Sequence, residues 1–188
     1  MNLRLNRRYT VCLGLSVTLL HCVMDVPQAT AQSRWNPVVA APVYANRPDT
    51  MQSLRRTALV LANRDRARYG LRTLLEDKLL NRAAQLHAED MLRRNYFSHI
   101  SPEGRSPSDR FAAVGGRGGA AENLAALKDP RLASAVVGTA QLNFFERQWM
   151  NSPGHRRNLL DSRFGRFGFG LAKAGDRIYA VQLFTFAQ

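Results

Sequence analysis

Cysteine is almost absent from this 188-residue chain, because Cys12 and Cys22 are the only two. Beyond residue 22 the sequence therefore has neither a thiolate nor the means to form a disulfide. That absence excludes a disulfide-stapled scaffold, a cysteine nucleophile and a cysteine zinc site there. A domain beyond that residue must be stabilised by its core alone.

Lysine is also scarce, with three residues against 24 arginines in a chain of formal charge +13. Guanidinium groups bind phosphate and carboxylate in a bidentate manner, which favours an anionic partner such as an envelope polymer or a lipid headgroup. A solvated basic surface without any partner explains the same charge. Hydrophobic residues at 45% and charged residues at 22% are typical of one globular domain and exclude wholesale disorder.

Long apolar runs are missing too, since none reaches the roughly 20 residues of a membrane-spanning helix. The longest, residues 11–23, follows a basic segment and precedes a small-x-small sequence at residues 29–31. This order predicts a secretory signal peptide over residues 1–31, cleaved after Ala31. We expect a secreted or periplasmic mature chain with no transmembrane span. A twin-arginine pair at Arg7-Arg8 and a lipoprotein-like sequence before Cys22 leave two variants of export open.

Residues 32–51 contain three prolines among small residues and show no sustained period, which predicts a linker before a domain at 52–188. Apolar spacing predicts helices over residues 52–69 and, after the capping residue Asp77, up to Asn95. Further helices are predicted from Ser106 to Val114, where the sequence has a capping box, and over residues 129–149.

The last part of the domain changes pattern. Phenylalanine and glycine alternate over residues 164–171, and residues 178–186 are rich in β-branched and aromatic side chains. Gly175-Asp176 turns one strand into the next. The outline is an α+β fold with three to four helices around a small sheet dominated by this hairpin.

Three histidines follow the predicted signal peptide. His87 lies on the apolar face of a helix, where a core histidine with locally satisfied nitrogens competes with a functional one. His99 follows Ser98 in a loop, and His155 begins a helix or a tight turn, positions at which functional histidines are common. Ser98 is expected to make a turn contact, since no Gly-x-Ser-x-Gly sequence is present.

Two histidines and a carboxylate would bind zinc with one open position if they met in space. Glu122, beside small residues, is the candidate carboxylate, with a capping or surface role as the alternative. Spacing alone does not bring it to His99 and His155. Nucleic acid is not an expected partner, because a secretion signal precedes the domain.

Several motifs occur in a fixed order along the domain. They are LANRDRA at 61–67, HAEDM at 87–91, NYFSH at 95–99, SPEG at 101–104, AENL at 121–124 and WMNSPGHR at 149–156. Together they closely resemble the bacterial secreted branch of the CAP superfamily, also called SCP-like or pathogenesis-related-1-like.

This resemblance implies an α-β-α sandwich with a mainly antiparallel sheet and a cleft that binds a divalent metal in some members. Carried over, it assigns His99, Glu122 and His155 to the cleft and its metal, zinc above others, with His87, Asn123 and Ser98 as secondary candidates. The sequence departs from the family's tetrad at two positions. Where eukaryotic members have the second glutamate of the tetrad, this sequence has Asn151 and Ser152. Where they have the histidine of the last strand, it has residues around Tyr179.

The resemblance leaves the activity open. The leading hypothesis is a secreted or envelope-associated binding module, and not an enzyme, whose His99/Glu122/His155 cleft is structural or holds a divalent metal. The alternatives are a metal-assisted, protease-like hydrolase using the same cleft, and lipid or anionic polymer binding through the arginine-rich surface.

Overall fold

The computed structural model describes residues 50–187. The predicted signal peptide, residues 1–31, and most of the predicted linker lie outside the described residues. The α-helices are α1 (Met51–Arg68), α2 (Lys78–Arg94), α3 (Pro107–Ala113), α4 (Thr139–Asn151) and α5 (Pro153–Leu159), with a short 3-10 helix η1 at Pro130–Leu132. The strands are β1 (Leu75–Glu76), β2 (Ala121–Lys128), β3 (Phe164–Ala174) and β4 (Arg177–Phe186). No helix within residues 50–187 combines the length and the hydropathy needed to cross a bilayer.

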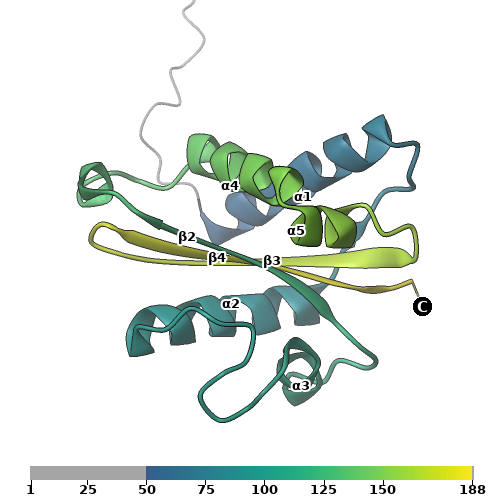
Figure 1. Ribbon diagram of the computed structural model, residues 1–188, viewed down its shortest axis with the longest axis horizontal. Coiled ribbons are helices and arrows are strands. Elements are labelled where there is room, and N and C mark those ends of the chain that lie inside the picture. Colours follow the sequence, from purple (N-terminus) through teal and green to yellow (C-terminus); the bar gives the residue numbers. More distant parts are fainter. Residues whose placement is uncertain (1–49, 188) are drawn as a thin grey trace, which may run out of the picture. The chain divides into compact units, whose positions relative to one another are not determined.

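The four strands form one sheet in the order β1-β3-β4-β2. Strand β4 pairs antiparallel with both β3 and β2, whereas the short β1 is parallel to β3. Helices α1, α4 and α5 cover one face of the sheet, and α2 and α3 cover the other (Figure 1). The predicted α-β-α sandwich with a mainly antiparallel sheet is confirmed.

Each face of the sheet has its own hydrophobic core. Aromatic residues dominate the core under α1, α4 and α5, where Phe145 and Trp149 pack with phenylalanines of the hairpin. Smaller residues dominate under α2, where Leu80, Ala84 and Met91 are fully buried. The layer formed by α2 and α3 can therefore approach the sheet closely.

Two glycines set that close approach. A Cβ at Gly168 would lie 2.3 Å from the backbone carbon of Leu80, and one at Gly170 would lie 2.3 Å from that of Ala84. Helix α2 thus rests with its backbone directly on β3, which any larger residue at either glycine would prevent. Asn81 fixes the register, because its Oδ1 accepts a hydrogen bond from the Phe169 amide at 2.8 Å.

The helix ends follow the local sequence. Asp77 caps α2, because its side chain accepts hydrogen bonds from the backbone amides of Leu79 and Leu80. Asn95 ends the helix in the left-handed backbone conformation, with a φ of 54°, which asparagine adopts more readily than most residues. Ser106 and Asp109 form the predicted capping box of α3. These local signals confirm the boundaries of α2 and α3.

The predicted helix over residues 129–149 is wrong. Asp129 caps only the short η1, and α4 begins after Gly138, whose extended backbone has φ −141° and ψ −164°. This extended residue interrupts the helical path, so the segment forms two elements and not a single helix. The described helices are accordingly more numerous than the three to four expected, and residues 121–128 add a strand that their alanine-rich composition does not predict.

Candidate functional site

Glu122 is the centre of the site. It lies on β2, an edge strand, and only 5% of its surface is exposed. Its Oε1 is 2.9 Å from Nδ1 of His99, and its Oε2 accepts from Nη2 of Arg110 at 2.7 Å. Both carboxylate oxygens are therefore engaged, one by the predicted histidine and the other by an arginine. The alternative interpretation of Glu122 as a capping or surface residue does not fit this burial.

Arg110 holds the loop that carries His99. Its Nη1 donates to the backbone carbonyls of His99 and Arg105, at 2.9 and 2.8 Å, while Nη2 pairs with Glu122. The side chain projects from α3 and is 10% exposed. One guanidinium thus fastens α3, β2 and the 95–106 loop to one another, which fixes His99 relative to Glu122.

The His99 imidazole lies at the surface end of this arrangement, with 51% of its side chain exposed. A carboxylate oxygen only accepts hydrogen bonds, so a neutral His99 must carry its proton on Nδ1. Its Nε2 is then an acceptor for an incoming group. Ser98 makes a turn contact, since its Oγ accepts from the Ile100 amide at 3.1 Å.

His155 reaches the site from the opposite helical layer. It lies in the first turn of α5 and is half-buried, and its carbonyl accepts from Nδ2 of Asn123 at 3.2 Å. Burial lowers the pKa of His155, and the nearby positive charge of His99 lowers it further. His99 is therefore close enough to act on the His155 imidazole across the edge of β2.

A chain of amides runs from the site into the core. Asn123 accepts from Asn158 at 3.0 Å and donates to Gln182 at 3.1 Å, and Gln182 donates to Glu146 at 2.8 Å. Glu146 is 1% exposed, and burial raises its pKa to about 8. A carboxyl group in this state is mostly protonated at neutral pH, so Glu146 belongs to the core and not to the cleft.

His87 lies behind Glu122, below the His99 loop. Its Nε2 is 3.1 Å from the Ser98 carbonyl and 3.8 Å from Oε2 of Glu122, and its Nδ1 is 3.5 Å from the Tyr96 hydroxyl. Burial lowers the pKa of His87 despite the attraction of Glu122. The imidazole supports the loop from inside, as the core interpretation of this residue proposes.

A groove of about 390 Å³ opens beside His155. Phe97, Phe144 and Trp149 give it an aromatic lining, and residues 124–126 of β2 form part of its wall. The Trp149 indole is fixed, because Nε1 donates to the Leu124 carbonyl at 2.9 Å. The edge of β2 thus places an apolar surface next to the His155 imidazole, and Phe97 in its lining lies two residues before His99.

The zinc site predicted at His99, Glu122 and His155 stays a prediction. Within the described residues, no group of three or more histidine, cysteine, aspartate or glutamate side chains is placed to hold a metal ion. Arg110 and His99 already occupy both oxygens of Glu122, so a cation would have to displace one of them. No metal cofactor is established for this site.

The sequence prediction misses Arg110 in the site, and it misses the network behind the site, which consists of Asn158, Gln182 and Glu146. Asn158 and Arg110 stand within or next to recognisable motifs, but their pairing partners are 12 to 36 residues away. Such pairing depends on the topology, and spacing alone does not reveal it.

Comparison with known proteins agrees with this architecture. The profile of CAP, the cysteine-rich secretory protein family, matches residues 59–186. The chain belongs to the CAP family, although its matched region contains no cysteine.

Individual relatives support the same assignment. YkwD of Bacillus subtilis (strain 168) is 33% identical over 129 residues, which cover 68% of this chain and 46% of that protein. A solved structure of an extracellular SCP-domain protein from Bacillus anthracis str. Ames is 31% identical with a TM-score of 0.58, covering 76% of this chain and 44% of the other. This chain therefore spans less than half the length of either protein. The structure of NaASP2 with Zn²⁺, 12% identical with a TM-score of 0.52 over 69% of this chain and 77% of the other, shares the fold.

Proposed function

We propose that this chain is an extracytoplasmic binding protein whose ligand lies over His99 and His155 and inserts an apolar group into the neighbouring groove. The extracellular SCP-domain relative and the predicted signal peptide support the location. The observation that carries the proposal is the exposed His99 imidazole, held at 2.9 Å by a buried carboxylate that is itself paired with Arg110.

The cleft favours a ligand with two adjoining chemical groups. Nε2 of a neutral His99 accepts a hydrogen bond, so the ligand presents an amide, a hydroxyl or an ammonium donor there. Phe97, Phe144 and Trp149 bury the apolar group beside it. A small number of fixed polar groups next to an apolar surface is typical of ligand sites.

The experiment uses the full chain and N-acetylphenylalanine amide as the probe, followed by NMR. We expect saturable shifts of the Trp149 indole and the His155 ring, and we expect both to be lost in a His99→Ala/Phe144→Ala double variant. Val60→Ala, a change at an exposed apolar residue of α1, is the matched control and should bind as the wild type does. Shifts that persist in the double variant, or that never involve Trp149 and His155, would refute the cleft.

A zinc titration of the same proteins by calorimetry tests the metal-assisted hydrolase. Stoichiometric zinc binding that disappears in His99→Ala/His155→Ala, together with chelator-sensitive turnover, would support the hydrolase over the binding module. The engaged oxygens of Glu122 make weak or absent zinc binding the expected result.

A further inference from the structure

The positive charge of the described chain is concentrated in two short segments, residues 64–72 and 156–166. Together they contain eight arginines and two aspartates, a formal excess of six positive charges. The remainder of residues 50–187 contains fourteen basic and ten acidic side chains, an excess of four. These two segments therefore carry more net charge than the rest of the described chain.

The fold brings the two segments together. Arg66 is fully buried, and its guanidinium donates to four backbone carbonyls, one in the first segment and three in the second, at 2.9 to 3.2 Å. Arg156 donates to the Tyr69 hydroxyl at 2.6 Å. In Figure 1 the end of α1, the loop after α5 and the start of β3 lie at the same end of the fold. We call this surface, formed by residues 64–72 and 156–166, the arginine end.

Most arginines of the arginine end face solvent. Six of them are exposed: Arg64, Arg68, Arg72, Arg156, Arg157 and Arg163. Both aspartates are already paired, Asp65 with two of these arginines and Asp161 with a third. The other three, Arg72, Arg156 and Arg157, pair with no carboxylate among residues 50–187. The arginine end therefore presents positive charge that the protein does not neutralise.

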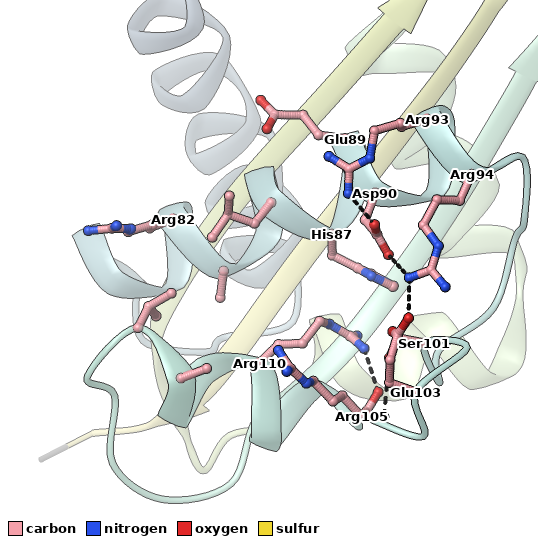
Figure 2. Close-up of a pocket in the computed structure, with 14 residues that line it drawn as sticks. Arg82, His87, Glu89, Asp90, Arg93, Arg94, Ser101, Glu103, Arg105 and Arg110 are labelled. Carbon is pink, nitrogen blue, oxygen red and sulfur yellow. Dashed lines mark hydrogen bonds and ion pairs between the residues drawn. The ribbon is translucent and has the colours of Figure 1, made fainter.

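Arginines on the opposite side of the sheet have a different setting. Figure 2 shows Arg93 and Arg94 of α2 beside carboxylates, and Asp90 pairs with both. Arg94 pairs with Glu103 as well. Charge there is compensated within the protein. At the arginine end, uncompensated like charges repel one another, and an anionic partner would relieve that repulsion.

Two exposed aromatic rings indicate the kind of partner. Tyr69 is 49% exposed and Phe186 is 46% exposed, and each lies beneath a guanidinium of the arginine end. At a bilayer surface, aromatic rings favour the headgroup region and clustered basic side chains bind anionic lipids. A soluble polyanion would engage the arginines but not the rings. The combination therefore favours a bilayer.

We propose that the arginine end docks on a bilayer that contains anionic lipids, with the exposed arginines on lipid phosphates and the rings of Tyr69 and Phe186 among the headgroups. The docking uses neither His99 nor the aromatic groove, so it does not depend on the ligand proposed for the cleft.

Sedimentation of the full chain with phosphatidylcholine vesicles, with and without phosphatidylglycerol, tests the docking. The test variant is Arg72→Gln/Arg156→Gln/Arg157→Gln. The matched control is Arg56→Gln/Arg82→Gln/Arg105→Gln, which removes the same charge from exposed positions near the start of α1 and across the sheet. We expect the affinity for phosphatidylglycerol vesicles to fall about tenfold or more in the test variant and much less in the control. Lysine at the three test positions keeps the charge and should restore most of the binding.

NMR locates the contact, because residues 1–49 are the same in all these proteins and contribute equally to sedimentation. With a gadolinium-chelating lipid in the vesicles, the amide signals of residues 68–72 and 160–163 should broaden more than those of α2. Broadening confined to other residues, or an equal loss of affinity in test and control variants, overturns the proposal. Binding to long-chain inorganic polyphosphate without binding to phosphatidylglycerol vesicles would assign the arginines to a soluble polyanion and would also overturn it.

Discussion

Glu122 and Glu146 are both buried, yet they meet different partners. Glu122 lies between an arginine and an exposed imidazole, whereas Glu146 receives one hydrogen bond from Gln182 and leaves its Oε1 without a partner. The Glu122 carboxylate, paired with a guanidinium, can orient an imidazole. The protonated carboxyl group of Glu146 only completes the hydrogen-bond network of the core. The comparison separates a site-building glutamate from a structural one, although Asn123, the neighbour of Glu122 in β2, is linked to Glu146 through Gln182.

The largest expected effect comes from Glu122→Gln. The amide leaves the guanidinium of Arg110 buried without its counter-charge, so the free energy of unfolding should fall by about 3–5 kcal/mol. Urea unfolding followed by tryptophan fluorescence measures this change. Glu89→Gln, at an exposed glutamate of α2, is the control and should change stability by less than about 0.5 kcal/mol. Equal effects of the two substitutions would remove the distinction on which the comparison rests.

Glu146→Gln should change the pH dependence of the free energy of unfolding. Burial raises the pKa of Glu146 to about 8, against 4.5 in a solvated carboxyl group, so the folded state holds a proton that the unfolded state loses. The free energy of unfolding of the wild type should therefore fall as the pH rises from 4.5 towards 8. The loss is on the order of 2–4 kcal/mol, and Glu146→Gln should not show it.

Urea midpoints of both proteins between pH 5 and pH 8 test this prediction. The variant should equal or exceed the wild type at pH 8, because it has no buried carboxyl group to ionise. Parallel curves for the two proteins would show that Glu146 is ionised in the fold.

Asn123→Ala tests the link between the two glutamates. The substitution removes hydrogen bonds to the His155 carbonyl, Gln182 and Asn158, which should lower the free energy of unfolding by about 1–3 kcal/mol. The NMR signals of the His155 ring should move, whereas those of His99 should stay in place because Glu122 holds it. Asn143→Ala, which removes a hydrogen bond from the amide to the Thr139 carbonyl one turn away, is the control. Displacement of both rings would mean that the two histidines form one unit.

Local signals made much of the fold predictable. The caps at Asp77 and Ser106, the helix end at Asn95 and the hairpin turn at Gly175-Asp176 are all where the sequence places them. The break at Gly138 was not predictable in this way, because apolar periodicity continues across it. Strand β2 is also hidden, since its pairing with β4 and not its alanine-rich sequence makes it a strand.

The site was only partly predictable for a related reason. The motifs identify His99, Glu122 and His155, but the ion pair of Arg110 with Glu122 depends on how α3 packs beside β2. That pair engages one oxygen of Glu122 and His99 engages the other, an arrangement that residue types alone do not reveal. Glu146 shows the converse, because its helical position near Trp149 does not reveal that it faces Gln182 in the core.

The tautomer of His99 tests the central claim most directly. Two-dimensional ¹H–¹⁵N NMR of the imidazole nitrogens, recorded on the wild type at a pH where His99 is neutral, shows which nitrogen is protonated. The account predicts a proton on Nδ1, directed at Oε1 of Glu122, and loss of that preference in Glu122→Gln. A proton on Nε2 in the wild type would contradict it, because the buried carboxylate would then not be holding the imidazole.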